Sequence, residues 1–166
     1  MEDIDIFKIL GALEIPFEKQ EHPPIFSEKD AEKIQICLDG IDVKNLFLKD
    51  KNSNYALVSM DLHQKADLKK IAAHLGFSRL SFCSADELLD ILNITPGSVS
   101  PLCIMADKKN CVRVLFDKNF CGKKVIIHPL RNTASISLSF DDLLRFVKYF
   151  NHKYQLGEFY KDETAV

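Results

Sequence analysis

Four short stretches of this 166-residue chain combine polar, rigid and chemically active residues in ways that packing alone does not require. In residues 42–48 (DVKNLFL), Lys44 and Asn45 open a strand that is otherwise apolar. A buried strand rarely begins with a cation and an amide unless the two side chains face a cleft. Lys44 and Asn45 are therefore candidates for binding a polar ligand, and a solvated strand end is the alternative interpretation.

The second stretch, residues 95–101 (TPGSVSP), places a glycine and several hydroxyl residues between two prolines. Such a loop is stiff, and the backbone N–H groups around Gly97 and Ser98 could be held pointing outward. Preorganised N–H donors of this kind stabilise the negative charge that develops on a carbonyl oxygen during acyl transfer. An ordinary turn would have the same composition.

The remaining two stretches are residues 21–27 (EHPPIFS) and residues 128–135 (HPLRNTAS). In the first, two prolines stiffen the entry to a helix and fix the direction of Phe26. In the second, His128 follows a short apolar strand, where a histidine is more often a hydrogen-bonded structural residue than a catalyst. These patterns allow a cleft built from strand ends, but they do not name a substrate.

The elements that must position these stretches follow from hydrophobic periodicity. Apolar residues repeat with a helical period over residues 6–13, 68–75, 85–92 and 143–150. Asp67, Ser84 and Ser139 are predicted N-caps, with Ser84 in a capping box. A weaker helix is expected after Ser27, with Ala31, Ile34 and Leu38 on its apolar side.

Strand-like runs lie between the helices. They cover residues 17–21, 43–49, 55–60, 80–83, 102–106, 112–116, 125–127 and 135–138. Polar turns predict two antiparallel hairpins, one joining residues 43–49 to 55–60 and one joining 102–106 to 112–116. We expect an α+β fold, a mixed and largely antiparallel sheet with helices packed around it, in one domain (residues 1–156) followed by a polar tail (residues 157–166).

Composition excludes several classes of protein. The 46% of apolar residues excludes a disordered chain, and the net charge of −2 argues against a tight, sequence-independent nucleic-acid binder such as a DNA-coating protein. Contact with one end of a nucleic acid remains compatible with that charge. No apolar run reaches the roughly 18 residues of a membrane span, and the acidic N-terminus does not resemble a signal peptide.

The cysteines indicate a reducing compartment. They number five, an odd count, and no pair has CxxC spacing: Cys37, Cys83, Cys103, Cys111 and Cys121. Free thiols in the cytoplasm are the expectation. No Cys or His pair has zinc-ligand spacing, so neither a metal nor a cofactor is expected.

Taken together, in this order and spacing, the four stretches resemble the YbaK/ProX family of free-standing aminoacyl-tRNA deacylases. The domain of that family also occurs inserted in bacterial prolyl-tRNA synthetases. The segments 22–27, 44–48, 97–101 and 128–135 look like the ProX branch, which removes alanine from mischarged tRNA(Pro). Ser135 stands where the family usually has threonine, a departure that keeps the hydroxyl.

The resemblance implies roles for individual residues. Lys44 would be the essential lysine that holds the terminal phosphate or ribose, and Asn45 would hydrogen-bond the aminoacyl group or the terminal nucleotide. The backbone at Gly97 and Ser98 would bind the ester carbonyl. His128 would form a wall of the amino-acid pocket, with a role as general base left open.

The resemblance also implies an amino-acid pocket that selects by size. The residues expected to line it are Ile25, Phe26, Ile34, Val43 and His128. The partner would be the 3′ aminoacyl end of a mischarged tRNA, with prolyl-tRNA synthetase as a possible second partner.

Two alternatives stay open. The same enzyme class could act on Cys-tRNA(Pro) or Ser-tRNA instead of Ala-tRNA(Pro). The second alternative is a non-catalytic module that recognises aminoacyl ends or docks on a synthetase. The intact Lys44, Asn45 and Gly97–Ser98 loop count against it.

Overall fold

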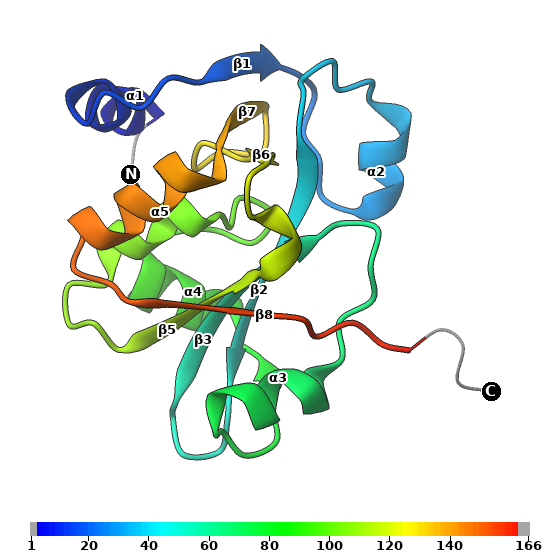
Figure 1. The fold of residues 1–166 in the computed structure, drawn as a ribbon, viewed down its shortest axis with the longest axis vertical. Coiled ribbons are helices and arrows are strands. Elements are labelled where there is room, and N and C mark those ends of the chain that lie inside the picture. The colour runs from blue at the N-terminus through cyan, green and yellow to red at the C-terminus, as the bar shows by residue number, and fades with distance from the viewer. Residues whose placement is uncertain (1–2, 163–166) are drawn as a thin grey trace.

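An eight-stranded mixed sheet crosses the computed structural model, which describes residues 3–162 (Figure 1). The strands are β1 (Glu18–Glu21), β2 (Ile41–Lys49), β3 (Tyr55–Asp61), β4 (Ser81–Phe82), β5 (Val112–Asp117), β6 (Lys124–Ile127), β7 (Ala134–Ser139) and β8 (Tyr154–Gly157). The helices are α1 (Asp3–Ala12), α2 (Glu28–Lys33), α3 (Leu68–Leu75), α4 (Ala85–Leu92) and α5 (Phe140–Tyr149), with 3-10 helices η1 (Pro101–Ala106) and η2 (Lys118–Phe120).

The strand order is β1-β7-β6-β2-β3-β5-β8, with the short β4 paired to β2. Of the described pairings, β1–β7, β2–β3, β2–β4 and β6–β7 are antiparallel. The pairings β2–β6, β3–β5 and β5–β8 are parallel. The predicted α+β class with a mixed, mainly antiparallel sheet is confirmed, and so is the hairpin of β2 and β3.

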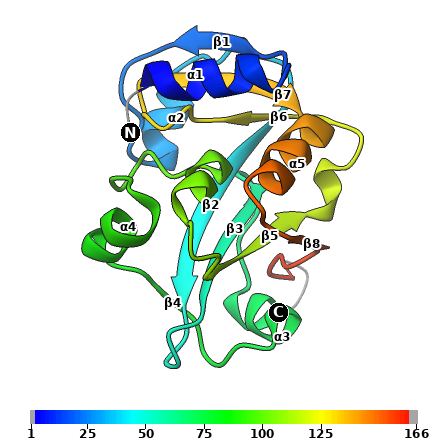
Figure 2. The same ribbon diagram turned by 90° about the vertical axis from the view of Figure 1, so that its left-hand side faces the viewer.

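Both faces of the central strands are covered, which explains their nearly continuous apolar sequences. Alternate residues point to opposite faces, so Phe47 and Leu57 join one core while Leu48 and Val58 join the other. The larger core lies under α1, α4, α5 and η1, and the smaller core lies under α3. Figure 2 shows α3 at the end of the molecule opposite to α1 and β1.

The helix ends follow the predicted capping chemistry. Asp67 accepts hydrogen bonds from two backbone N–H groups at the start of α3, and Gly76 ends that helix in the left-handed conformation. Ser84 and Glu87 form the capping box of α4, and Ser139 caps α5. These side chains satisfy N–H groups that a helix leaves without a partner in its first turn.

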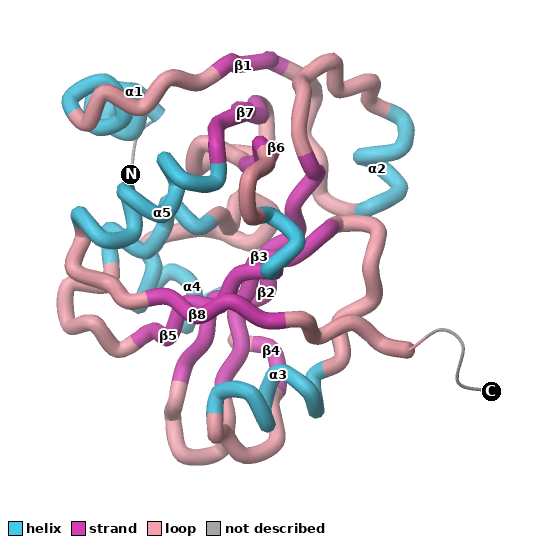
Figure 3. Tube along the Cα trace, viewed as in Figure 1, coloured by secondary structure: helices cyan, strands magenta, loops and turns pink. Residues whose placement is uncertain are grey.

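The prediction of a strand over residues 102–106 was wrong. This run is the 3-10 helix η1, and it packs between α4 and α5 (Figure 3). Ser100 caps it by accepting the N–H of Leu102, and Pro101 occupies the first turn, where its missing N–H costs nothing. A short buried apolar run has no periodicity that separates strand from helix, and here the Ser-Pro start was the decisive signal.

The predicted polar tail begins too early. Gly157 ends β8, which pairs with β5, and Phe159 is 1% exposed in the smaller core. Tyr160 forms a bridge with Ala66 and donates a hydrogen bond to Asp117. The chain therefore stays part of the fold through Tyr160, and residues 163–166 lie outside the described part. No helix within residues 3–162 has the length and apolarity to cross a bilayer.

Candidate active site

The sheet divides at β2, and this division makes room for a cavity. Ile41 and Asp42 pair with β6, whereas residues 43–49 pair with β3. In a continued parallel register, Lys44 would lie opposite His128, the first residue after β6. The pairing of β2 with β6 ends at Asp42 and Ile126 instead, and α2, which lies beside β2 in Figure 1, contributes residues to the cavity lining.

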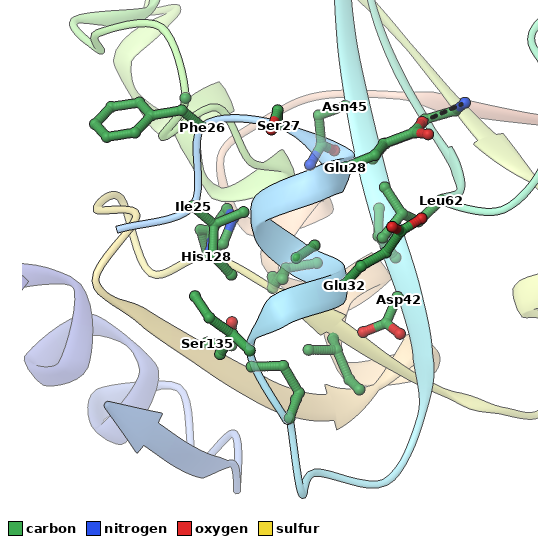
Figure 4. A pocket seen from close by; sticks show the side chains of 18 of the residues that line it. Ile25, Phe26, Ser27, Glu28, Glu32, Asp42, Asn45, Leu62, His128 and Ser135 are labelled. Atoms are coloured by element: carbon green, nitrogen blue, oxygen red, sulfur yellow. Dashed lines mark ion pairs between the residues drawn. The ribbon is translucent and has the colours of Figure 1, made fainter. Parts of the chain in front are cut away.

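The cavity between these elements has a volume of about 420 Å³, within the range of small-molecule sites. Figure 4 shows its residues around α2. Eight of the nine predicted site residues line it: Ile25, Phe26, Ile34, Val43, Lys44, Asn45, Gly97 and His128. The four stretches identified in the sequence therefore meet at one place.

Lys44 is the only lysine or arginine among the described residues that line this cavity. Its side chain is 20% exposed, and its ammonium lies 3.7 Å from a carboxylate oxygen of Glu28, which is itself 65% exposed (Figure 4). That distance is longer than a charge-assisted hydrogen bond. The ammonium is thus available to an anionic group that enters the cavity.

The Gly97 loop is a tight turn. Ser98 donates its N–H to the carbonyl of Thr95 at 3.2 Å, Pro96 and Gly97 form the corner, and Gly97 has a φ of +89°. Proline followed by a left-handed residue is typical of a type II turn. The Gly97 N–H donates no hydrogen bond within residues 3–162, which leaves it available to a ligand.

Ser98 differs from expectation. It is 7% exposed and is absent from the cavity lining, and the turn already uses its N–H. The expected pair of backbone donors is therefore reduced to Gly97. A hydrogen bond across a turn competes with any ligand for the same N–H group.

Asn45 connects the loop to the sheet. Its amide nitrogen donates to the carbonyl of Val99 at 3.2 Å, and its oxygen accepts from the hydroxyl of Ser59 at 2.6 Å. These bonds fix the Gly97 turn relative to β2 and β3. The side chain expected to contact the substrate directly is thus held in the supporting structure of the turn.

His128 and Ser135 form one wall. The Nδ1 atom of His128 lies 3.0 Å from the carbonyl oxygen of Ala134, and burial lowers the pKa of His128 below its ordinary value of 6.5. His22, whose ring centroid is 6.1 Å from that of His128, contributes to the same direction of shift. Burial and the neighbouring His22 therefore both favour the neutral imidazole form of His128.

The first and fourth stretches are fastened side by side. His22 and Ile25 donate their backbone N–H groups to the carbonyls of Thr133 and Asn132. Arg131 binds both carboxylate oxygens of Glu21 at 2.7 Å. This bidentate pair lowers the pKa of Glu21 from 4.5 to about 2. The wall is thus held to β1 by main-chain bonds and by one ion pair.

Comparison with known proteins identifies the family. The aminoacyl-tRNA editing domain family matches residues 22–146, about three quarters of the chain. The chain is 41% identical over 141 residues to the prolyl-tRNA editing protein ProX of Acetoanaerobium sticklandii, with 84% of this chain and 86% of that protein covered.

The chain belongs to the aminoacyl-tRNA editing domain family. It is also 36% identical over 149 residues to the prolyl-tRNA synthetase associated domain-containing protein 1 of Mus musculus, covering 86% of this chain and 88% of that one. The predicted YbaK/ProX resemblance is confirmed, and with it the class of aminoacyl-tRNA editing deacylases.

Solved structures support the fold. A crystal structure described as a candidate trans-editing enzyme for prolyl tRNA synthetase superposes with a TM-score of 0.70 at 17% identity, covering 95% of this chain and 97% of that one. At that identity the likeness concerns the architecture alone. The α+β fold predicted for this chain is confirmed, and it is the fold of that solved structure.

One contact of this editing domain lay beyond the sequence analysis. His22 and Ser135 are hydrogen-bonded at 2.8 Å although they are 113 positions apart, and Ser135 lines the cavity. The motif ends at Ser135, which marked the residue but not its partner.

No group of three or more His, Cys, Asp or Glu side chains suited to a metal ion occurs in the described part of the editing domain.

The apolar residues predicted to line the pocket lie at different depths in the cavity. Ile34, expected on a helical face, is the extended residue that ends α2 and faces the cavity from there. Phe26 is 72% exposed, and Figure 4 shows its ring pointing away from α2. A Cβ on Gly97 would lie 3.3 Å from that ring. Phe26 is thus part of the rim beside the Gly97 turn.

Proposed function

We propose that this protein is a trans-editing deacylase that hydrolyses the ester of mischarged tRNA(Pro), with Ala-tRNA(Pro) as its substrate. The observation that carries the proposal is the convergence of Lys44, the Gly97 turn and a set of apolar side chains on one cavity. A cation, an available backbone donor and a small apolar pocket are what an aminoacyl ester at the end of an RNA requires.

The reaction is hydrolysis of an activated ester. A water oxygen attacks the carbonyl carbon, negative charge builds on the carbonyl oxygen, and the bond to the ribose oxygen then breaks. The ribose oxygen takes up a proton, giving free alanine and uncharged tRNA. The neighbouring ribose hydroxyl of the substrate is positioned to assist the water, so no nucleophilic side chain is required.

The protein supplies position and charge. Lys44 binds the terminal phosphate or ribose and orients the ester. The Gly97 N–H binds the carbonyl oxygen as its charge develops, and one donor of this kind contributes roughly 2.7–4 kcal/mol in other hydrolases. Asn45 acts as a positioning residue, because its bonds to Val99 and Ser59 hold the turn that carries Gly97.

Selectivity comes from size. A synthetase that charges proline discriminates weakly against a smaller amino acid, since one methylene is worth about 1–3 kcal/mol. A second site that admits alanine but has no room for a pyrrolidine ring removes the error. Ile25, Ile34 and Val43 belong to the apolar part of this second site, and His128 lines the same cavity.

The partners follow from the substrate. The 3′ aminoacyl end of tRNA enters the cavity, and prolyl-tRNA synthetase, which releases the mischarged product, is the proposed protein partner. The enzyme works in the cytoplasm, where charged tRNA is made and used. Size-exclusion chromatography of the two proteins with and without tRNA tests the association.

A panel of charged tRNAs tests the activity. Purified protein is incubated with Ala-, Cys- and Pro-tRNA(Pro) and with Ser-tRNA, and the ester remaining is compared with spontaneous hydrolysis. We expect rapid loss of Ala-tRNA(Pro) and no acceleration for Pro-tRNA(Pro). Faster loss of Cys-tRNA(Pro) or Ser-tRNA would change the assigned amino acid, and stability of every ester would leave only a binding role.

A further inference from the structure

His128 and Ser135 form a wall of the cavity. Whether each of their polar atoms donates or accepts a hydrogen bond follows from the partners that already take their protons. Nδ1 of His128 faces a carbonyl oxygen, which can only accept, so Nδ1 carries the proton. In the neutral ring, Nε2 is then bare and can only accept a hydrogen bond. Burial lowers the pKa of His128 and so favours this neutral form.

The same argument applies to Ser135. Nδ1 of His22 lies 2.8 Å from the carbonyl oxygen of Pro23, so that nitrogen carries the proton of the neutral ring. Nε2 of His22, 2.8 Å from the Ser135 hydroxyl oxygen, therefore accepts the hydroxyl proton. The Ser135 oxygen is left with lone pairs but no hydrogen for a ligand.

The two acceptors belong to residues that line the same cavity. The carbonyl that orients His128 belongs to Ala134, the residue before Ser135, and both His128 and Ser135 line the cavity. Figure 4 shows the two side chains on the same side of α2. This wall therefore contributes two acceptors to the cavity lining, and each has its own proton directed elsewhere.

We propose that His128 Nε2 and Ser135 Oγ together bind the α-amino group of the aminoacyl ester. This assignment rests on the proposed function and specifies which end of the amino acid lies at this wall. The protonated α-amino group carries three N–H donors and no acceptor, and it is the one donor-only group beside the ester. A carbonyl or phosphate oxygen would meet two acceptors here and be repelled.

Binding of this kind orients the substrate. With the α-amino group at His128 and Ser135, the ester carbonyl extends toward the Gly97 turn and the ribose toward Lys44. The amino-acid side chain then faces the apolar residues. His128 and Ser135 would thus bind the α-amino group, which every amino acid has, while the apolar residues select by the size of the side chain.

Stable amide analogues of the ester separate binding from turnover. The probes are 3′-alanylamino-3′-deoxyadenosine and its lactyl counterpart, in which a hydroxyl replaces the α-amino group. We expect the alanyl analogue to bind roughly 10- to 100-fold more tightly by calorimetry, the range for hydrogen bonds to a charged group. Equal affinities, or no binding of either analogue, would overturn the proposal.

The variant Ser135→Ala tests the wall itself. It should weaken the alanyl analogue about 10-fold and change the lactyl analogue little, whereas Ser135→Thr, which keeps the hydroxyl, should restore the preference. A purely structural role would weaken both analogues alike. If Ser135→Ala leaves the ratio of the two affinities unchanged, the assignment is wrong.

The same probes distinguish the two proposals. Tight binding of the alanyl analogue with no hydrolysis of Ala-tRNA(Pro) would refute the proposed activity and keep the amino-group site. Hydrolysis of Ala-tRNA(Pro) and of lactyl-tRNA(Pro) with equal kcat/KM, each measured above its spontaneous rate, would support the proposed activity and refute the amino-group site. A preference for a seryl over an alanyl analogue that disappears in Ser135→Ala would assign the acceptors to a side-chain hydroxyl and overturn the proposal.

Discussion

Lys44 and Lys49 lie five residues apart on β2, and each faces a glutamate from a helix, yet the two pairs differ. Lys49 binds Glu87 at 2.8 Å, and that hydrogen bond raises the pKa of Lys49 and lowers that of Glu87. Lys44 is the less exposed of the two, at 20% against 36%, but lies 3.7 Å from Glu28. Lys44 is thus paired only loosely, with a carboxylate that is itself exposed, which suits a cation kept for an incoming anion.

The supporting elements explain the difference. Glu87 also accepts the Ser84 N–H in the capping box of α4, so its carboxylate is fixed. Glu28 belongs to α2, a helix of six residues with no buried residue, and its side chain is 65% exposed. The first pair strengthens the fold, whereas the second leaves its lysine free to exchange partners.

The largest effect expected from this comparison is on activity. Lys44→Ala should lower kcat/KM for Ala-tRNA(Pro) at least about 100-fold with Tm nearly unchanged, because it removes the cation that orients the ester. Lys49→Ala is the matched control and should keep activity while lowering Tm slightly. Equal activities of the two variants would show that the contrast between the pairs has no functional meaning.

The turn beside Lys44 gives the next largest effect. Gly97 and Gly122 both have positive φ, +89° and +75°, so alanine at either costs about 1–2 kcal/mol of stability. Only at Gly97 would the new methyl group lie 3.3 Å from Phe26, beside the cavity. We expect Gly97→Ala to lower kcat/KM roughly 10-fold and Gly122→Ala to leave it unchanged, at similar Tm values. Comparable kcat/KM values for the two variants would argue against an ester-binding turn.

Replacing the glutamate of each pair should have different effects on activity and on stability. Glu28→Ala frees Lys44 from a competing carboxylate, and kcat/KM should rise roughly two- to fivefold at low salt, the range for an exposed ion pair. Glu87→Ala should instead lower Tm with activity retained, since the capping box is lost. A fall in kcat/KM for Glu28→Ala would mean that Glu28 contributes to substrate binding.

The smallest effect concerns a third ion pair, between Glu21 and Arg131. The folded-state pKa of Glu21 is about 2, below the ordinary 4.5, so this pair stabilises the fold fully above pH 4.5 and loses its effect as pH falls toward 2. Glu21→Gln should lower Tm by roughly 2 °C at pH 7 and by less at pH 3. A Tm difference that does not change with pH would contradict a role for the charge.

The sequence predicts the elements whose signals are local. The caps at Asp67, Ser84 and Ser139 act within one turn of the residues they bind, so their patterns are readable without the tertiary fold. The strand β8 has no such signal, because it is a short edge strand held by its pairing with β5. Helix η1 was misassigned because burial made its run uniformly apolar.

In the candidate site too, some features could be predicted from the sequence and others depend on the tertiary structure. The resemblance to the editing family brought Lys44, Gly97 and His128 to one cavity, and all three line the cavity in the structure. No pattern of residues indicated that Asn45 would be held by Val99 or that Ser98 would use its N–H within the turn. Which groups are already bonded depends on distances between segments remote in the chain, and a pattern of residue types does not contain them.

The position of Phe159 affects how the polypeptide folds during synthesis. Phe159 completes the core beneath α3, after strands that lie more than ninety positions earlier in the chain, such as β3. A nascent chain that has not yet released Phe159 from the ribosome leaves the core on one face of the sheet, which contains Leu48, Val58 and Leu115, incomplete. Until then, that sheet face is a surface for chaperones to cover.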